Sequence, residues 1–454
     1  MHFKPVCLSL LLAVLAPAAL SQTTISRDFE SAGFADITVH DDQHVRIAVR
    51  DDNFNAALPA SWRSWWYVQA HYDLEAGQHL QLDIANRGWQ YFYTPFYSYD
   101  QKLWRRIDEN NVSQTADCDT GIEGCVLSFN HPAKYDHVYF ATFMPYPTSA
   151  LDNFVKRIST DASVSIETLG FSQHYQLPIY HITITDPNST KQKSRVWIHG
   201  RSHPAETPSS FVLEGFINFL ISGHPVARSL RNHLIFHIVP MHNVDGVFEG
   251  NYRSNPDSID FESSWYFDKN NPAVLTAKAP QETQMINAVM RRLLDDDIPV
   301  KMALNLHASN SEPDTAIFAF PHFGDNRKDY SRSERDLWEH QLTFIDYLTR
   351  LYDNRIELPP EEGGRGFLNS FFPETWWWNN KQNDVMAMTI EMTYGKAGFD
   401  HWITDVEQRH FGEALAKSIA VYFALEDAPL LPPALEDRVR RDSIIYQPGF
   451  EAFK

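Results

Sequence analysis

A histidine and a glutamate stand three residues apart in the segment IHGRSHPAETPSS, as His203 and Glu206. A pair at this spacing can bind one metal ion, since histidine nitrogens and carboxylate oxygens are common zinc ligands. The pair decides little by itself, because the chain contains 20 histidines and 58 acidic residues and has a second H-x-x-E at His410 and Glu413. That second pair falls within a predicted amphipathic helix, and we interpret it as part of the protein surface.

More polar residues follow apolar segments that have the composition of β-strands. Asn243 comes after HLIFHIVPM, His307 ends VKMALNLH and Glu391 follows DVMAMTI, just as His203 follows SRVWIHG. In an α/β protein the carboxyl ends of the strands meet at one edge of the sheet, which is where ligands bind. We therefore expect these four positions to converge.

The converging residues are suited to metal-assisted hydrolysis. His203, Glu206 and His307 would supply two nitrogens and one carboxylate, which is a ligand set of catalytic zinc sites that leave a position for water. Zinc lowers the pKa of bound water to about 7 and polarises a carbonyl group. Glu391 could then act as general base, and Arg253 could stabilise a developing oxyanion.

The segments around these positions alternate between predicted strands and helices from about residue 176. Strands are predicted at 179–186, 194–200, 233–241, 300–307 and 384–392, and helices at 209–222, 280–297 and 404–427. Near-continuous apolar strands of this kind are typical of a mostly parallel mixed sheet flanked by helices. We predict an α/β domain over residues 170–427, followed by an irregular tail over 428–454. Thr404 and Glu407 form a capping box at the start of its last helix.

The preceding part of the chain has a different pattern. Short runs rich in β-branched and aromatic residues, such as HVRIAV and HLQLDIAN, are separated by Gly, Asn, Asp and Pro. This pattern predicts an all-β sandwich domain over residues 22–165.

Residues 1–21 have the features of a secretory signal peptide: a weakly basic start, an apolar core and small residues before Gln22. An uncleaved membrane anchor is the alternative, although the apolar run of about 15 residues is shorter than the ~20 that a spanning helix needs. Cys118 and Cys125 would remain as an even pair, for which we expect a disulfide rather than two unrelated thiols. We therefore predict export, either to the periplasm or out of the cell.

The net charge of −19 bears on partners. A strongly acidic chain is repelled by nucleic acids and by anionic membrane surfaces. We expect neither as a partner, and we expect no transmembrane segment after signal cleavage.

Four motifs resemble the zinc carboxypeptidase (funnelin) family, in particular its cytosolic-carboxypeptidase branch. They are GRSHPAE, VPMHNVDGVFEGNYR, LNLHAS and MTIEM, and the segment WRSWWYVQAHYDLEAGQHLQLDIAN is similar to the β-sandwich of that branch. The resemblance spans about residues 60–425. It implies one Zn²⁺ per chain bound by His203, Glu206 and His307, with Glu391 as general base and Arg253 as the carbonyl-polarising arginine. The predicted signal peptide departs from the cytosolic location of that branch.

One departure concerns the family's D-x-N-R-x-W motif, whose Asn-Arg pair binds the terminal carboxylate of the substrate. Asp260 and Trp265 match it here, but Glu262 and Ser263 stand in place of Asn and Arg. A carboxylate repels a substrate carboxylate, and the bidentate guanidinium is missing. Arg365 in EGGRGF could replace it.

The candidate substrate-binding residues are therefore Asn243, Glu262, Ser263 and Arg365. The segment FFPETWWWNN lacks the family's tyrosine, and its tryptophans could either contact substrate or form a buried cluster.

The sequence thus predicts an exported zinc-dependent peptidase of carboxypeptidase type with altered C-terminal specificity. Its substrate would be a peptide or another amide, and Glu262 favours a cationic group on it. One alternative is a zinc amidase that acts on a non-protein or cell-wall amide. Another is a non-catalytic binding protein that retains the zinc.

Overall fold

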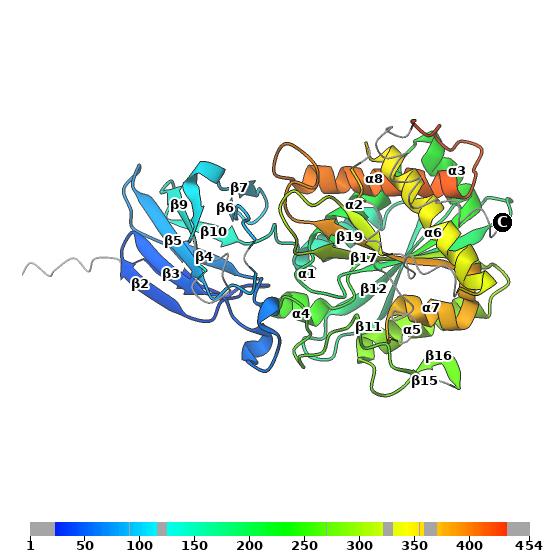
Figure 1. Ribbon diagram of the computed structural model, residues 1–454, viewed down its shortest axis with the longest axis horizontal. Coiled ribbons are helices and arrows are strands. Elements are labelled where there is room, and N and C mark those ends of the chain that lie inside the picture. The colour runs from blue at the N-terminus through cyan, green and yellow to red at the C-terminus, as the bar shows by residue number, and fades with distance from the viewer. Residues whose placement is uncertain are drawn as a thin grey trace, which may run out of the picture.

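The computed structural model describes residues 23–89, 91–115, 125–268, 270–320, 330–353, 355–357 and 370–433. They form an N-terminal β-rich body and a larger α/β body, which lie at the left and right of Figure 1. The predicted signal peptide, Cys118, Arg365 and most of the predicted tail lie outside the described residues. Among the described helices, none is long and apolar enough to cross a membrane.

The N-terminal body contains two sheets. One has the order β1 (Thr24–Ser26), β4 (Tyr67–His71), β10 (His137–Ala141), β6 (Phe96–Ser98), β7 (Arg105–Arg106). The other has the order β2 (Ile37–Asp41), β3 (His44–Ala48), β5 (His79–Ala85), β9 (Leu127–Pro132), β8 (Val112–Gln114). Alternate residues of β5, namely Leu80, Leu82 and Ile84, are fully buried in one apolar core with Val68 and Phe140 of the facing sheet. The predicted all-β sandwich is therefore confirmed.

The α/β body is built on one mixed sheet. Its strand order is β11 (Val164–Phe171), β12 (Pro178–Ile184), β14 (Leu234–Val239), β13 (Ser194–Gly200), β17 (Val300–Ser309), β19 (Met386–Thr393), β18 (Phe318–Phe320). The four strands from β14 to β19 are parallel. At the edges, β12 runs antiparallel to β14 and β18 antiparallel to β19. The predicted α/β class is confirmed, and the parallel centre contains every strand that precedes a candidate site residue.

Helices cover both faces of this sheet. They are α1 (Thr148–Ile158), α2 (Pro208–Leu220), α3 (Pro225–His233), α4 (Val244–Glu249), α5 (Gln281–Leu294), α6 (Arg332–Leu351), α7 (Pro373–Lys381) and α8 (Asp405–Tyr422). Figure 1 shows α2 and α8 on one side of the sheet and α5 and α7 on the other. The capping box of Thr404 and Glu407 is present at the start of α8.

Close packing of α2 against α8 depends on two glycines. A Cβ atom on Gly215 would lie 2.1 Å from the carbonyl oxygen of Arg409, and one on Gly412 would lie 2.1 Å from that of Val212. Only a residue without a side chain allows the two backbones to approach so closely.

Smaller elements complete the structure. A two-stranded sheet consists of β15 (Phe267–Asp268) and β16 (Asn271–Leu275), and short 3₁₀ turns include η1 (Asp52–Phe54) and η2 (Ala60–Trp62). The two bodies share an apolar core, because Trp65 and Phe96 of the N-terminal body belong to the same buried cluster as Trp197 and Ile198 of β13. Helix α1 also packs into this cluster, although the sequence places it within the range predicted for the sandwich.

Candidate active site

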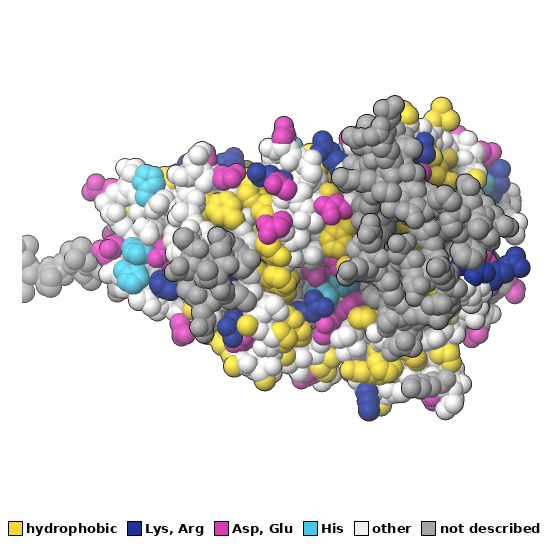
Figure 2. Space-filling view, in the orientation of Figure 1, with side chains coloured by type: hydrophobic (Ala, Val, Ile, Leu, Met, Phe, Trp, Pro, Cys, Tyr) yellow, Lys and Arg dark blue, Asp and Glu magenta, His cyan; other side chains and the backbone are white. Residues whose placement is uncertain are grey.

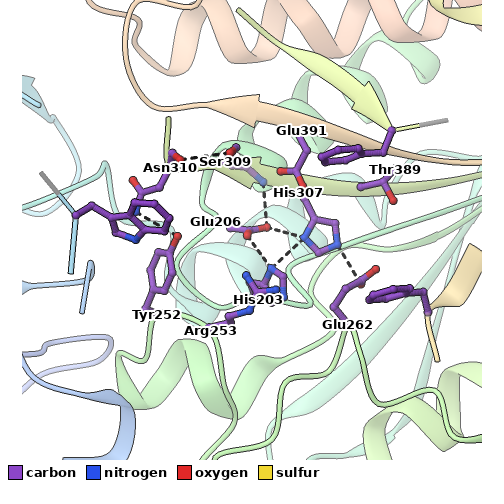
Figure 3. Close-up of a pocket in the computed structure, with 14 residues that line it drawn as sticks. His203, Glu206, Tyr252, Arg253, Glu262, His307, Ser309, Asn310, Thr389 and Glu391 are labelled. Atoms are coloured by element: carbon purple, nitrogen blue, oxygen red, sulfur yellow. Dashed lines mark hydrogen bonds and ion pairs between the residues drawn. The ribbon is translucent and has the colours of Figure 1, made fainter. Parts of the chain in front are cut away.

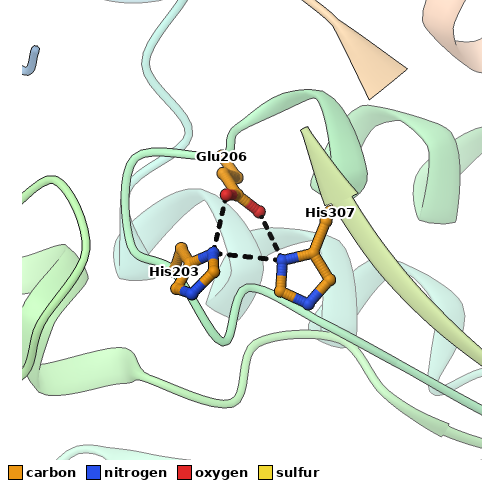
Figure 4. Close-up of side chains that lie close together, drawn as sticks. All are labelled: His203, Glu206 and His307. Carbon is orange, nitrogen blue, oxygen red and sulfur yellow. Dashed lines mark hydrogen bonds and ion pairs between the residues drawn. The ribbon is translucent and has the colours of Figure 1, made fainter. Parts of the chain in front are cut away.

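Three predicted metal ligands lie together where β13 and β17 end (Figure 4). The Oε1 atom of Glu206 is 2.7 Å from Nδ1 of His203, and its Oε2 atom is 2.8 Å from Nδ1 of His307. The two Nδ1 atoms are 3.1 Å apart. Among the described residues, this trio is the one group whose ligand atoms could hold a metal ion, since they all lie within 4.8 Å of one another.

The chemistry of this donor set fits zinc. All three side chains are buried, and burial alone would raise the pKa of Glu206. The two imidazoles beside it instead hold that pKa well below its usual range, so the carboxylate is ionised. Two ring nitrogens and a carboxylate aimed at one point are the three protein ligands of a catalytic zinc site.

Two further carboxylates fix the orientation of the histidine rings. Asp260 Oδ1 lies 3.2 Å from Nε2 of His203, and Glu262 Oε2 lies 3.0 Å from Nε2 of His307. A ring that donates from Nε2 presents an unprotonated Nδ1 to a metal, and such partners raise the affinity of the site. Burial opposes ionisation of Asp260, but His203 and Arg253 hold its pKa well below its usual range.

The turn that carries His203 and Glu206 is held by a residue that the sequence analysis did not single out. Arg201 follows β13 with a left-handed backbone (φ 61°) and is almost wholly buried. Its guanidinium donates to the carbonyl oxygens of Pro204 and Tyr146 and, at 2.7 Å, to Ser210 Oγ. The sequence did contain a signal for this role, because Arg201 is a charged residue between an apolar strand and the H-x-x-E pair.

Glu391 lies beside the trio because of strand register. His307 on β17 is the direct partner of Glu391 on the neighbouring parallel strand β19. The Oε2 atom of Glu391 is buried without a hydrogen-bond partner in the described structure. Burial raises the pKa of Glu391 to about 7, although the charges of His307 and His203 act in the opposite direction. A carboxyl group with such a pKa can exchange a proton near neutral pH.

These residues line a cavity of about 290 Å³, shown in Figure 3. Its walls include the trio, Glu391, Glu262 and Arg253. The Nε atom of Arg253 donates to Asp260 Oδ2 at 2.9 Å, so Asp260 connects this arginine to His203. In Figure 2 histidine, acidic and basic side chains meet in a hollow between the two bodies.

The predicted substrate-binding residues are placed differently from one another. Glu262 lines the cavity, but its oxygens are bonded to His307 and to Asn305 Nδ2, the latter at 2.9 Å. Ser263 is exposed and is not among the residues that line the cavity. Asn243 is not in the cavity wall either: its Oδ1 atom caps α4 by accepting from Gly246 N, and its Nδ2 atom donates to Ser202 O. Its side chain is therefore occupied within the fold.

Glu374 is a further buried acidic residue, beside the cavity wall, that the sequence analysis missed. Its Oε1 atom accepts from Thr389, a cavity-lining residue, at 2.7 Å, and its Oε2 atom has no hydrogen-bond partner in the described structure. The neighbouring Trp376 and Trp377 are buried, which supports the buried-cluster alternative for them. An acidic residue within the aromatic segment FFPETWWW was the signal.

Comparisons with known proteins agree with this fold. Residues 150–408 match the zinc carboxypeptidase family, and residues 25–143 match the cytosolic carboxypeptidase N-terminal domain. The chain therefore belongs to the zinc carboxypeptidase family. The metal of this family is zinc, and His203, Glu206 and His307 form a ligand group for it.

Individual relatives cover less of the chain or share only its fold. Cytosolic carboxypeptidase 6 from Mus musculus is 38% identical over 176 residues, which are 37% of this chain and 32% of the relative. The Homo sapiens protein of the same name is 36% identical over 176 residues, which are 37% of this chain and 34% of the relative. The chain thus spans about a third of the length of these curated relatives. The crystal structure of a metallo-carboxypeptidase from Burkholderia cenocepacia is 20% identical, with a TM-score of 0.72 over 89% of this chain and 99% of that one.

The trio predicts the outcome of a metal-binding experiment. His307→Ala removes one of three protein ligands, so this protein should no longer retain zinc, whereas wild type should carry one zinc per chain. His410→Ala, which alters the exposed second H-x-x-E, is the matched control and should retain the metal. Metal analysis of the purified proteins decides; stoichiometric zinc in His307→Ala would show that the ligands lie elsewhere.

Proposed function

We propose that this protein is an exported zinc peptidase that cleaves the amide bond next to a residue with a cationic side chain. The observation that carries the hydrolytic part is the meeting of two histidine Nδ1 atoms, the Glu206 carboxylate and Glu391 in one cavity. The cationic preference rests on Glu262 in the cavity wall and on Glu374 beside it.

The side chains divide the work of hydrolysis among them. Zinc held by His203, Glu206 and His307 would polarise the scissile carbonyl and acidify the attacking water. Glu391 accepts a proton from that water and can deliver it to the leaving amine. The guanidinium of Arg253 donates from Nε to Asp260 and makes no hydrogen bond through its terminal nitrogens among the described residues, so these nitrogens can stabilise negative charge on the carbonyl oxygen.

Two acidic residues lie on this side of the cavity: Glu262 is in the wall and pairs with His307, and Glu374 lies behind the lining residue Thr389 and has no basic partner among the described residues. Glu262 and Glu374 lie near Asn305, whose Oδ1 atom is also buried without a hydrogen-bond partner in the described structure. Burial and the charge of Glu262 raise the pKa of Glu374 to about 7. A cation on this side of the cavity would offset these charges, while a carboxylate would be repelled.

The residues at positions 262 and 263 are also compatible with an amidase. Glu262 and Ser263 replace the pair that binds a terminal carboxylate, and Ser263 does not reach the cavity. A substrate without a free C-terminal carboxylate, such as a cell-wall amide, would not need that pair. A non-catalytic binding role is less well supported, because Glu391 is in place beside the metal ligands.

A direct test separates an enzyme from a binder. Wild type should hydrolyse members of a library of peptides and cell-wall fragments, and a chelator should abolish turnover until zinc is restored. Glu391→Gln should keep the zinc and lose about 10²–10⁴-fold in kcat, which is the usual contribution of acid–base assistance. A rate in Glu391→Gln close to that of wild type would mean that another group is the base.

Glu374 predicts a charge-selective rate. Wild type should prefer a peptide with a basic terminal residue over a matched neutral one by about 30-fold or more in kcat/KM, since losing one partner of a buried charge pair costs at least ~2 kcal/mol. Glu374→Gln should lose most of this preference. Glu282→Gln, which alters a buried carboxyl group bonded to Gln173 N outside the cavity, should keep it.

The preference should also depend on pH. Because the pKa of Glu374 is raised to about 7, this group is charged above that pH and neutral below it. The ratio of the two kcat/KM values should therefore rise between pH 6 and pH 8, and the titration of the shared base cancels in that ratio. If this ratio does not change with pH, or if Glu374→Gln has the same ratio as wild type, Glu374 does not select the cationic substrate. Amide-capped versions of both peptides distinguish the carboxypeptidase from the amidase.

Export and the disulfide belong to the same proposal. The mature protein should begin near Gln22, and Cys118 should be bridged to Cys125, which is buried. N-terminal sequencing of protein from the native host and mass spectrometry of a non-reduced digest measure both. An intact N-terminus, or two free thiols, would argue against an exported protein.

A further inference from the structure

The N-terminal body contacts the segment that carries Arg253. Short turns of the sandwich around η1 reach residues 249–255, which join α4 to the loop that leads to Asp260. Three residues of the sandwich make these contacts: Arg50, Asp52 and Asn53. They come from a different domain of the chain and lie about 200 positions earlier in the sequence.

Asp52 makes the most concentrated contact. Its carboxylate accepts hydrogen bonds from three successive backbone amides, those of Tyr252 (2.7 Å), Arg253 (2.9 Å) and Ser254 (2.8 Å). It also accepts from Ser254 Oγ at 3.0 Å, and only 2% of its surface is exposed. Three consecutive amides that point at one carboxylate fix the backbone on both sides of Arg253.

The neighbours of Asp52 hold the two ends of the same segment. Arg50 Nη2 donates to the carbonyl oxygens of Glu249 (2.6 Å) and Gly250 (2.9 Å). Asn53 Nδ2 donates to the carbonyl of Asn255 at 2.8 Å. Asn53 and Phe54 have left-handed backbones, with φ of 55° and 56°, an uncommon conformation that persists where surrounding contacts stabilise it.

The side chain of Arg253 is also positioned from two directions. Its guanidinium lies 5.7 Å from the ring centroid of Trp62, which belongs to η2 of the N-terminal body. Its Nε atom donates to Asp260. The backbone contacts of Asp52, the ring of Trp62 and the carboxylate of Asp260 together hold the arginine at the cavity wall.

We propose that Asp52 is a positioning residue for hydrolysis, which acts through Arg253, so that the N-terminal domain completes the active site. This inference rests on the proposed function for its kinetic consequences. Its physical reason is that a charge-stabilising group contributes only when it is held at the right place, and a displacement of about 1 Å can cost ~10²-fold in rate. The Asp52 carboxylate removes that freedom from the backbone of Arg253.

A double-mutant cycle tests the route of action. Asp52→Asn keeps the shape but replaces one acceptor oxygen by a donor, and it should lower kcat/KM about 10-fold or more with zinc content unchanged. Arg253→Ala should lower kcat/KM about 10²–10³-fold. In the Arg253→Ala background, Asp52→Asn should change kcat/KM by less than about 2-fold, because residues that act as one unit are not additive. Losses that multiply would overturn the inference.

Hydrogen exchange gives a readout that does not depend on activity. In Asp52→Asn the amides of residues 252–254 should exchange faster than in wild type, since they lose their shared acceptor. Glu30→Gln is the matched control: Glu30 is also a carboxylate of the N-terminal domain, but it accepts from Thr148 Oγ1 and Ser149 N at α1. That variant should leave both the rate and the exchange of residues 252–254 unchanged.

A milder variant covers the case in which Asp52→Asn does not fold. Asn53→Ala removes the bonds to Asn251 and Asn255 and should give a smaller kcat loss that again disappears in the Arg253→Ala background. If wild type hydrolyses no amide, the proposed function is wrong, and the exchange of the three amides still decides whether Asp52 holds the segment. If wild type is active and Asp52→Asn matches it in rate and exchange, only this inference fails.

Discussion

The active site depends on the pairing of charged side chains that are buried at the ends of the central strands. His203, Glu206 and His307 are almost wholly removed from water, and an unpaired charge there would be strongly destabilising. The chain meets this constraint by surrounding the histidines with carboxylates: Glu206 between the Nδ1 atoms, and Asp260 and Glu262 at the Nε2 atoms. The same carboxylates orient both rings toward the position of a metal ion. They therefore provide both the charge pairing and the ring orientation that metal binding needs.

The hydrogen bonds around these carboxylates also connect the two domains. Asp260 pairs with both His203 and Arg253, and the backbone of Arg253 is bonded to Asp52 in the sandwich. The shared apolar core around Trp65 and Trp197 keeps the domains in contact, which allows such short polar contacts to form. The sandwich therefore forms part of the cavity wall in addition to covering the α/β domain.

Much of the site could be predicted because its residues sit at the ends of recognisable strands. The apolar runs before His203, His307 and Glu391 predicted parallel strands, and parallel strands bring their carboxyl ends to one edge. The roles of Asn243 and Glu262 could not be predicted in this way. Asn243 caps α4, which is a local contact that the start of a helix can indicate, whereas Glu262 bonds to a histidine ring 45 positions later, a contact that no local pattern indicates.

The sequence by itself determined the fold class, the candidate metal ligands and the candidate base, because strand composition, residue type and order along the chain are local properties. Only the tertiary structure decided which groups surround them. Glu374 beside the cavity wall, Arg201 beneath the ligand turn and Asp52 behind Arg253 each act through contacts between segments that are distant in sequence or through burial. Such contacts depend on the packing of the whole chain, and no spacing of residue types encodes them.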